Sequence, residues 1–394
     1  MTPPAEQKSR AVTAPRHSIH STLLALAIGL ALALMLGEIA VRCFAHFGGR
    51  PGRRLGTRDP LGIIYEPFGN SGYRQKPGKV ETFINGTRAT YNSMGYRGPL
   101  VSVERPAGVY RIILLGGSTT VGFGVNDGET IDSFMRGLLQ TQYPGSCFEV
   151  VNLGLGGYDS YQDFERMRVD GTRLHPDLVI IHSGINDVRN AQFPELTSPP
   201  DRRTLIWEGE MQRMRQGRGV LSRAWDLTRH YSYLARIPGF MAELSNQRHT
   251  LGVIRVVEPH DAAQDYFETN VVRTVELSLA SGAAVLLSRP PSAIPIRNQP
   301  SDPVERSYWI RDAGSTEEYR NRLAARMQDI ARRYRAEGKP VGYVTHTLPL
   351  EQYLDDAHLT AAGNQTVARD LVAAGRPYFP SGDVSGTQRS CPGR

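Results

Sequence analysis

Short apolar runs alternate with longer amphipathic stretches from residue 110 to the C-terminal region of the chain. Five runs have strand length and are nearly continuous in apolar residues: 111–115, 148–153, 178–183, 283–288 and, more weakly, 341–345. Hydrophobic residues recur with helical spacing in the stretches between and after them: 130–140, 161–169, 262–279, 317–337 and 362–374. Continuous apolar strands separated by helices indicate a parallel sheet covered on both faces. The pattern therefore predicts an α/β fold, a three-layer α/β/α sandwich around a five-stranded parallel sheet.

An uncharged apolar segment occupies residues 21–37. A membrane-spanning helix needs about 20 mostly apolar residues, a length that this segment reaches only by including Glu38, which is tolerable near the interface. The length of the run and the lack of a clear small-x-small cleavage motif argue against a cleaved signal peptide, and Arg42 before Cys43 argues against a lipoprotein site. We therefore expect one transmembrane signal-anchor helix over residues 19–42, with a cleaved signal as the alternative.

Composition divides the rest of the chain into further segments. Residues 1–18 hold Pro, Ser, Thr and basic residues without periodicity, which is typical of a disordered tail. Residues 43–108, rich in Gly, Pro and Arg, are expected to form a linker and an irregular lead-in to a domain at 109–376. Within this domain, the arginine-rich residues 190–260 interrupt the alternation, and we expect a helical insertion at the mouth of the site. Residues 377–394 are the expected C-terminal tail.

The net charge of +7 arises from 46 Lys and Arg residues against 39 Asp and Glu residues. No dense basic block with interleaved aromatic residues accompanies it, so nucleic-acid binding is not expected. Basic residues flank the apolar segment on both sides, and charge bias therefore assigns it no orientation. The three cysteines form neither a disulfide framework nor a CxxC metal motif. A Cys147–Cys391 disulfide is one interpretation for a domain outside the cytoplasm, but we expect two unpaired thiols.

Ser118 follows the first apolar run and two glycines, in the order Gly116-Gly117-Ser118. The glycines permit a tight turn at the end of a buried strand, and the hydroxyl then lies where a helix can begin. Ligand sites in parallel sheets lie at the carboxyl ends of the strands. Gly157 follows the second run and Asn186 follows the third, so we expect both to meet Ser118 at the same edge of the sheet.

A nucleophilic serine needs a general base, and the base needs a group that orients it. His358 is the expected base, because Asp355 lies three residues earlier and both side chains can fall on the same side of one turn. Asp356 is the competing orienter, although adjacent side chains point apart. The alternative role for Asp355 and His358 is to cap the following helix. His346 is the rival base, but the sequence places no suitably spaced carboxylate beside it.

The negative charge that develops during ester cleavage needs hydrogen-bond donors. The backbone N–H groups of Ser118 and Gly157 and the side-chain amide of Asn186 are the expected oxyanion hole. Gly154 and Gly156 lie in the same glycine-rich segment and leave the register of Gly157 open. The alternative roles are a turn glycine for Gly157 and a loop cap for Asn186.

Four neighbouring residues have expected roles of their own. Asp187 is expected to fix its loop, and His182, at the end of the third apolar run, is expected to be a structural histidine. Tyr158 and Asp159 follow the glycine-rich segment. For these two, lining the pocket and a structural role are equally supported.

The order and spacing of these motifs resemble those of the SGNH (GDSL-like) hydrolase superfamily. The four blocks of that family correspond, in sequence order, to Ser118, Gly157, Asn186 and His358. Residues 184–187 match its G-x-N-D block, and residues 355–358 match its D-x-x-H block. The resemblance covers about residues 90–375. Residues 92–97, part of an expected structured turn at 91–98, and the apolar segment are similar to the membrane-anchored bacterial branch.

The resemblance implies a flavodoxin-like sandwich and ester hydrolysis through an acyl-serine intermediate, with neither a metal nor an organic cofactor. Consistently, the sequence has no H-E-x-x-H, P-loop or dinucleotide-binding motif. The elbow motif of α/β-hydrolases does not fit, because Thr120 stands where that motif has glycine. Gly117 precedes the serine where relatives carry aspartate. That aspartate is outside the triad, so this departure bears on fine tuning rather than on the reaction.

The sequence therefore predicts a membrane-anchored serine esterase that acts on a glycan- or lipid-linked O-acyl ester. The apolar segment predicts one membrane crossing, and the resemblance implies that the catalytic domain is on the extracytoplasmic, periplasmic side of the cell membrane. An O-acyltransferase or deacetylase acting on an envelope polysaccharide is the second hypothesis, since the same triad can pass an acyl group to a sugar hydroxyl. The third hypothesis is a non-catalytic envelope binding protein that has kept the fold.

Overall fold

A five-stranded parallel sheet forms the centre of the molecule and confirms the predicted fold class. The computed structural model describes residues 19–48, 64–83, 85–190, 219–241, 261–297, 310–380 and 391. The strands are β5 (Val109–Gly116), β6 (Cys147–Asn152), β7 (Leu178–His182), β8 (Ala284–Ser288) and β9 (Val341–Val344). Their order is β6-β5-β7-β8-β9, and every neighbouring pair is parallel. The carboxyl end of β5 therefore lies between those of β6 and β7.

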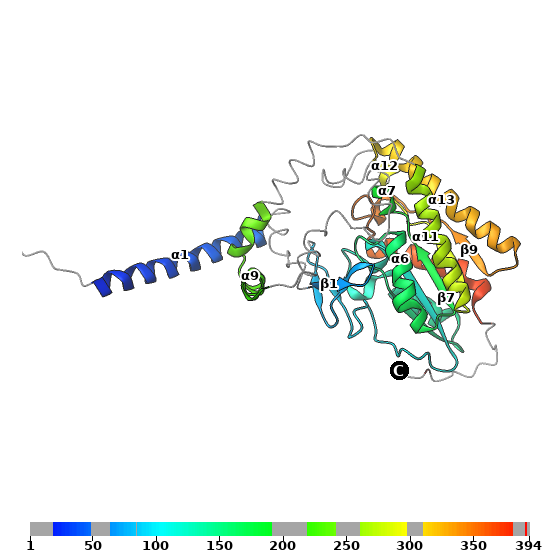
Figure 1. The fold of residues 1–394 in the computed structure, drawn as a ribbon, viewed down its shortest axis with the longest axis horizontal. Coiled ribbons are helices and arrows are strands. Elements are labelled where there is room, and N and C mark those ends of the chain that lie inside the picture. The colour runs from blue at the N-terminus through cyan, green and yellow to red at the C-terminus, as the bar shows by residue number, and fades with distance from the viewer. Residues whose placement is uncertain are drawn as a thin grey trace, which may run out of the picture.

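Helices cover both faces of this sheet (Figure 1). One face is covered by α6 (Ser160–Arg166), α11 (Asp261–Ala280) and α13 (Ala313–Ala336), and the other by α5 (Ile131–Gln142) and α14 (Ala361–Gly375). Alternate side chains of β5 enter the two cores: Ile113 and Leu115 enter the first, and Ile112 and Leu114 enter the second. This alternation explains why residues 112–115 of the strand are all apolar, since both of its faces are buried.

Three one-turn helices begin just beyond the carboxyl ends of the strands. They are α4 (Ser118–Val121) after β5, α7 (Asp187–Asn190) after β7 and α12 (Ile294–Arg297) after β8. The remaining short elements are a π-helix at Met167–Gly171 and 3-10 helices at Asp127–Glu129, Thr172–Leu174, Leu234–Arg236, Leu350–Gln352 and Arg376–Tyr378. The loops that carry the sequence motifs thus gather along one edge of the sheet.

The lead-in before the domain is more regular than its Gly- and Pro-rich composition predicts. It contains two antiparallel pairs, β1 (Tyr65–Phe68) with β2 (Gly72–Gln75) and β3 (Val80–Thr82) with β4 (Arg88–Thr90). Tyr73 of β2, Phe83 directly after β3 and Tyr91 directly after β4 pack with Val121 and Tyr158 of the domain in a separate core. Aromatic side chains bury enough area to stabilise such short strands, so this segment is part of the folded unit.

Arg97 connects the lead-in to the loop that follows Ser118 through hydrogen bonds. The expected turn at 91–98 forms around Asn92, whose side-chain oxygen accepts two backbone N–H bonds from the residues just after it. Arg97 then extends into the domain with only 3% of its surface exposed. Its guanidinium donates to the carbonyl groups of Val121 (2.9 Å), Gly122 and Val125 (2.7 Å). Charge-assisted bonds of this kind are among the stronger ones, and they fix the loop after the serine.

Helix α1 (Ile19–Phe47) extends away from the domain (Figure 1). It is long and apolar enough to cross a membrane, and no residue of the most apolar window within it is buried. Its C-terminal part contacts the insertion. Glu38 accepts hydrogen bonds from the Ser232 hydroxyl (2.7 Å) and from the backbone N–H groups of Tyr233 (2.9 Å) and Leu234 (3.0 Å). Arg42 donates to a backbone carbonyl of the same segment and lies over the Tyr233 ring.

The described part of the predicted insertion, residues 219–241, is helical as expected. It holds α9 (Val220–Tyr231) and the 3-10 helix at Leu234–Arg236, and α9 lies beside the C-terminal end of α1 (Figure 1). The other predicted insertion residues, 191–218 and 242–260, lie outside the described residues, as do the tail at 1–18 and residues 381–390.

Cys147 and Cys391 form a disulfide, so the prediction of two unpaired thiols is wrong. The two Cα atoms are 5.5 Å apart, across 244 positions of sequence. Cys147 is the first residue of β6, an edge strand, and the chain returns to it near its C-terminal end. Such a return depends on the course of the whole chain, which residue spacing does not encode. Cys43 is free and exposed.

We expect Cys391→Ser to lower the free energy of unfolding by about 2–5 kcal/mol, because the bond closes a loop that spans most of the chain. Cys147→Ser should have a similar effect, and the double variant should lose no more than either single one. Cys43→Ser is the matched control and should behave as wild type. Guanidinium unfolding with and without a thiol reductant measures these effects. A wild type whose unfolding is insensitive to the reductant would contradict the expectation.

Candidate active site

The turn after β5 leaves no room for side chains before Ser118. A Cβ at Gly116 would collide with the side chain of Thr120 and with the carbonyl of His182. A Cβ at Gly117 would lie 2.5 Å from Nδ2 of Asn186. A side chain at position 117 would therefore require the Asn186 amide to shift from the position it has here.

Ser118, His358 and Asp355 form one hydrogen-bonded chain. The Oγ atom of Ser118 is 2.8 Å from Nε2 of His358, and Nδ1 of His358 is 2.6 Å from Oδ2 of Asp355. The second carboxylate oxygen of Asp355 accepts the backbone N–H groups of Ala357 (2.9 Å) and His358 (2.7 Å). Burial alone would raise the pKa of Asp355, but His358 and these hydrogen bonds hold it well below its usual range. Asp355 is therefore a carboxylate throughout the neutral range.

The contacts at this motif bear on its two alternative interpretations, in which Asp356 orients the ring or Asp355 and His358 cap the following helix. Asp355 bonds to the imidazole ring, whereas Asp356, the competing orienter, has its Oδ1 atom 3.9 Å from Nε of Arg297. The cap of α14 is Thr360, whose hydroxyl accepts the backbone N–H of Gly363. Phe123 packs against the His358 ring, with the two ring centroids 4.5 Å apart.

The expected oxyanion-hole residues converge around the carbonyl of Tyr158. Nδ2 of Asn186 donates to this carbonyl (2.7 Å), and Gly157, with φ of 82°, is the residue just before it. An amide nitrogen carries two N–H groups, so one remains for a ligand in the cavity that Asn186 lines. Gly154 has a packing role, because a Cβ there would lie 2.8 Å from Thr120. Because Gly154 has this packing role, Gly156 is the remaining alternative to Gly157 in this segment.

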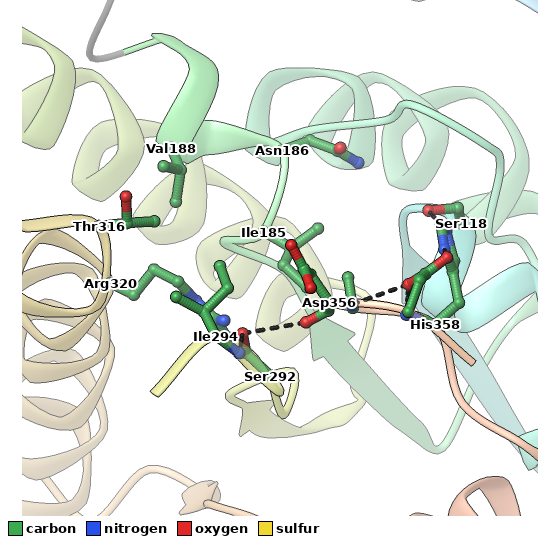
Figure 2. Close-up of a pocket in the computed structure, with 12 residues that line it drawn as sticks. Ser118, Ile185, Asn186, Val188, Ser292, Ile294, Thr316, Arg320, Asp356 and His358 are labelled. Carbon is green, nitrogen blue, oxygen red and sulfur yellow. Dashed lines mark hydrogen bonds and ion pairs between the residues drawn. The ribbon is translucent and has the colours of Figure 1, made fainter. Parts of the chain in front are cut away.

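These side chains open into a cavity of about 110 Å³ (Figure 2). Ser118, Asn186 and residues 355–358 line it, as their motifs predict. The rest of its wall comes from Ile185, Val188, Ser292, Ile294, Thr316 and Arg320. The last five belong to no motif. The sequence signal for Ser292 and Ile294 is that they follow β8 and so lie near the carboxyl edge of the sheet. None of residues 219–241 lines the cavity.

A family model described as the GDSL-like lipase/acylhydrolase family matches residues 114–366, which is more than half of the chain. The chain belongs to the GDSL-like lipase/acylhydrolase family. This acylhydrolase is therefore an ester-hydrolysing enzyme, and the family part of the sequence prediction is confirmed. A comparison with curated proteins gave no match.

Several solved structures are similar to this acylhydrolase. One is an alpha/beta hydrolase enzyme from the metagenome of Lake Arreo, 17% identical, with 69% of this chain and 97% of that chain covered and a TM-score of 0.41. A catalytic mutant of an acetylxylan esterase from Geobacillus stearothermophilus is 18% identical, with 69% and 97% covered and a TM-score of 0.39. A GDSL-like lipase from Bacteroides thetaiotaomicron is 18% identical, with 68% and 89% covered and a TM-score of 0.36.

Three further residues near the acylhydrolase motifs, Asp187, Asp159 and Tyr158, have structural contacts. Asp187 accepts hydrogen bonds from the backbone N–H and the hydroxyl of Ser160, which fixes its loop to the start of α6 as expected. Asp159 caps α6 through the N–H groups of Tyr161 and Gln162, and the Tyr158 hydroxyl donates to a backbone carbonyl of the lead-in. Neither Tyr158 nor Asp159 lines the cavity. Both therefore have the structural role.

His182 and His346 belong to a separate buried chain. Nδ1 of His182 is 2.8 Å from Oγ of Ser288, which is 2.9 Å from Nε2 of His346, and Nδ1 of His346 is 2.9 Å from Oδ2 of Asp370. His182 is 1% exposed, contacts Ser288 and does not line the cavity, so it is a structural histidine as expected, and burial holds its pKa well below the usual range. As expected, no suitably spaced carboxylate lies beside His346 in the sequence, but one approaches it in the fold. Asp370 supplies one from α14, and helix packing rather than sequence spacing brings it there.

Asp163 lies on α6 beneath the turn that leads to Ser118. It is 1% exposed, and the Ser183 hydroxyl donates to its carboxyl group. Burial raises the pKa of Asp163 to about 8, the hydrogen bonds from Ser183 and the Gly116 backbone oppose this rise, and the charge of Asp187 adds to it. Within the described residues, no group of three or more His, Cys, Asp or Glu side chains is arranged to hold a metal ion.

We expect the buried acid to make the stability of the enzyme fall between about pH 4 and pH 8. In the unfolded chain Asp163 loses its proton near its ordinary value of 3.8, whereas the folded protein keeps that proton until about 8. The unfolded state therefore binds fewer protons in this window, and the free energy of unfolding decreases as the pH rises. Each unit of difference is worth about 1.4 kcal/mol, so the loss amounts to several kcal/mol.

Asp163→Asn removes this titration and should lose less stability over the same window. Guanidinium unfolding at pH 4.5 and 7.5 measures the difference. Asp329→Asn, which changes an exposed aspartate paired with Arg332 on α13, is the control and should follow wild type. If Asp163→Asn shows the same pH dependence as wild type, the carboxyl group is ionised in the folded protein.

Proposed function

We propose that this acylhydrolase is a membrane-anchored serine esterase that cleaves O-acyl esters through an acyl-enzyme on Ser118. The observation that carries the proposal is the chain of contacts from Ser118 through His358 to Asp355, which opens into a cavity. A hydroxyl becomes nucleophilic when an adjacent base accepts its proton and a third group orients that base. All three parts are present at hydrogen-bond distance.

The first half of the reaction forms the acyl-enzyme. Nε2 of His358 takes the proton of Ser118 as Oγ attacks the ester carbonyl carbon, and a tetrahedral intermediate forms. The backbone N–H groups of Ser118 and Gly157 and the amide of Asn186 then stabilise its oxyanion. The intermediate collapses when the bond to the alcohol oxygen breaks and His358 gives its proton to that oxygen. The alcohol leaves, and the acyl group stays on Ser118.

The second half repeats these steps with water. His358 takes a proton from the water as its oxygen attacks the acyl carbon, and later returns that proton to Oγ of Ser118, so that the acid leaves and the serine is regenerated. Asp355 stays ionised throughout. It holds the imidazole in the tautomer that presents Nε2 to the serine and stabilises the imidazolium that forms in each half.

The cavity supports a short acyl group as the substrate class. A cavity of roughly 150 Å³ holds one benzene ring, whereas this one has about 110 Å³. It therefore fits an acetyl-like group or an acyl chain of a few atoms. Its wall is mainly apolar, with a few hydroxyl groups and an arginine, and its small volume suits a short acyl group better than a long lipid chain.

We expect Ser118→Ala to abolish hydrolysis of aryl acetates and labelling by a fluorophosphonate, because the nucleophile is gone. Asp355→Asn should lower kcat by about 10⁴-fold, because the amide favours the wrong histidine tautomer. Asp356→Asn should lose far less, since it is the same change one residue along and Asp355 remains bonded to the ring. Equal losses in the two asparagine variants would contradict the proposed role of Asp355. Equal hydrolysis by wild type and Ser118→Ala would contradict the mechanism.

We also propose that α1 is retained as an anchor. The contacts of Glu38 and Arg42 with residues 231–234 support this, because removal of a signal sequence would discard one side of a built interface. The Cys147–Cys391 disulfide supports a domain outside the cytoplasm, since disulfides persist in oxidising compartments.

The purified protein should retain residues 19–47 by mass spectrometry and should stay in the membrane fraction after alkaline carbonate washing. Leu30→Asp places a charge in the middle of the apolar run, which costs about 2.5–3.5 kcal/mol in insertion, and should release protein into the soluble fraction. Phe47→Asp, the same charge at the end of α1, is the matched control and should stay in the membrane fraction. A mature protein that begins after residue 47 would show that α1 is a cleaved signal.

A further inference from the structure

We infer that Arg320 makes this site selective for esters that carry a carboxylate close to the reacting carbonyl. The inference deepens the proposed esterase function and rests on it. The ligand chemistry is one anionic group within a few atoms of the ester. Two sources present it: a dicarboxylic acyl chain, or an acylated alcohol that is itself a sugar acid.

The Arg320 side chain is buried in the cavity wall with one nitrogen unsatisfied. It is 5% exposed and extends from α13 toward the cavity beside Ser292 and Ile294 (Figure 2). Nη2 donates to the carbonyl of Pro290 (2.7 Å). In the described part of the chain, Nη1 has no hydrogen-bond partner, and Oε2 of Glu317 is 3.8 Å away from it. A buried donor without an acceptor costs free energy that a ligand oxygen would recover.

Glu317 does not satisfy Arg320, because another arginine competes for it. The other carboxylate oxygen of Glu317 forms a short ion pair with Arg289. A guanidinium frequently binds a carboxylate through two parallel hydrogen bonds. Arg320 instead lies 3.8 Å from one oxygen of a carboxylate whose other oxygen is bonded to Arg289. Burial lowers the pKa of Arg320 to about 10, so the side chain is still a cation at neutral pH.

The other charged groups of the cavity wall face partners of their own. Asp355 bonds to His358, and Asp356 faces Arg297 across 3.9 Å. Arg320 is therefore the cation in the described wall whose hydrogen-bonding capacity is left for a ligand. A substrate carboxylate satisfies it without displacing an existing hydrogen bond.

The shape of the cavity sets where that carboxylate must be. Ser118 and Arg320 lie on opposite sides of the cavity, and the apolar side chains of Ile185, Val188 and Ile294 contribute to its wall (Figure 2). A volume of about 110 Å³ leaves space for only a few non-hydrogen atoms. The carboxylate is thus separated from the ester carbonyl by a short, partly apolar spacer.

Two matched pairs of esters test the inference and distinguish the sources. In the first, ethyl hydrogen succinate is compared with ethyl succinamate, its uncharged isostere. In the second, an O-acetylated methyl glucuronoside is compared with the corresponding glucuronamide. Full-length enzyme in detergent should hydrolyse the anionic member of one pair with a kcat/KM about 10- to 100-fold higher, the range for a hydrogen bond to a charged group. The pair that shows the preference identifies which half of the ester bears the carboxylate.

Variants then assign the preference to Arg320. Arg320→Met should bring the ratio of the two kcat/KM values close to one, and Arg320→Lys, which keeps the charge, should retain part of the preference. Arg322→Met is the matched control, because Arg322 is on the same helix with its side chain half exposed and paired with Glu318. It should keep the wild-type ratio. If Arg320→Met does not fold, the Arg320→Lys ratio and the wild-type preference still decide the question.

The outcomes separate this inference from the proposed function. A wild type that hydrolyses the neutral esters but prefers neither anionic partner overturns the inference and leaves the esterase proposal standing. A preference that persists in Arg320→Met also overturns it. A wild type that hydrolyses no ester and is not labelled at Ser118 overturns the proposed function, and the inference falls with it.

Discussion

The absence of side chains at Gly116 and Gly117 is the constraint on which the site depends. Any Cβ at Gly116 would meet the carbonyl of His182, and one at Gly117 would meet Asn186 and the carbonyl of Tyr158. The ends of β5, β6 and β7 can therefore approach one another closely enough for groups from three loops to surround Ser118. Because the surrounding atoms are closely packed, the turn has no space for larger residues. An aspartate in this turn would require Asn186 to lie elsewhere, so Gly117 and the position of Asn186 are coupled.

The position of the base, His358, depends instead on contacts within its own loop. Asp355 uses one oxygen for the imidazole of His358 and the other for the backbone N–H groups that follow it, so a single carboxylate shapes the loop and orients the ring. The loop closes on itself, since the backbone N–H of Leu354 donates to the carbonyl of His358 (2.8 Å). Because all of these contacts lie within five residues, the ring position follows from local sequence.

This difference in range explains how much the sequence could predict. The strands, the covering helices and the D-x-x-H spacing are patterns within short windows, and they were predicted. The pairings of Cys147 with Cys391, of His346 with Asp370 and of Arg97 with the loop after Ser118 join distant segments. They depend on the course of the chain and on how helices pack, which periodicity does not report. The hairpins of the lead-in were missed because their strands are only three or four residues long, and their Gly- and Pro-rich composition is typical of irregular loops.

Glu38, at the end of the apolar segment, is another residue whose role depends on contacts between distant segments. In the sequence, Glu38 is a defect in a membrane helix, because a charge in hydrocarbon is costly. In the structure it receives three hydrogen bonds from residues 232–234, so it marks where the helix meets the insertion. The apolar part of α1 before it, residues 19–37, rises about 28 Å at 1.5 Å per residue, close to the roughly 30 Å of a hydrocarbon core. In the proposed membrane-anchored arrangement, Glu38 therefore marks the end of the apolar part of α1, where the 219–241 segment is hydrogen-bonded to it.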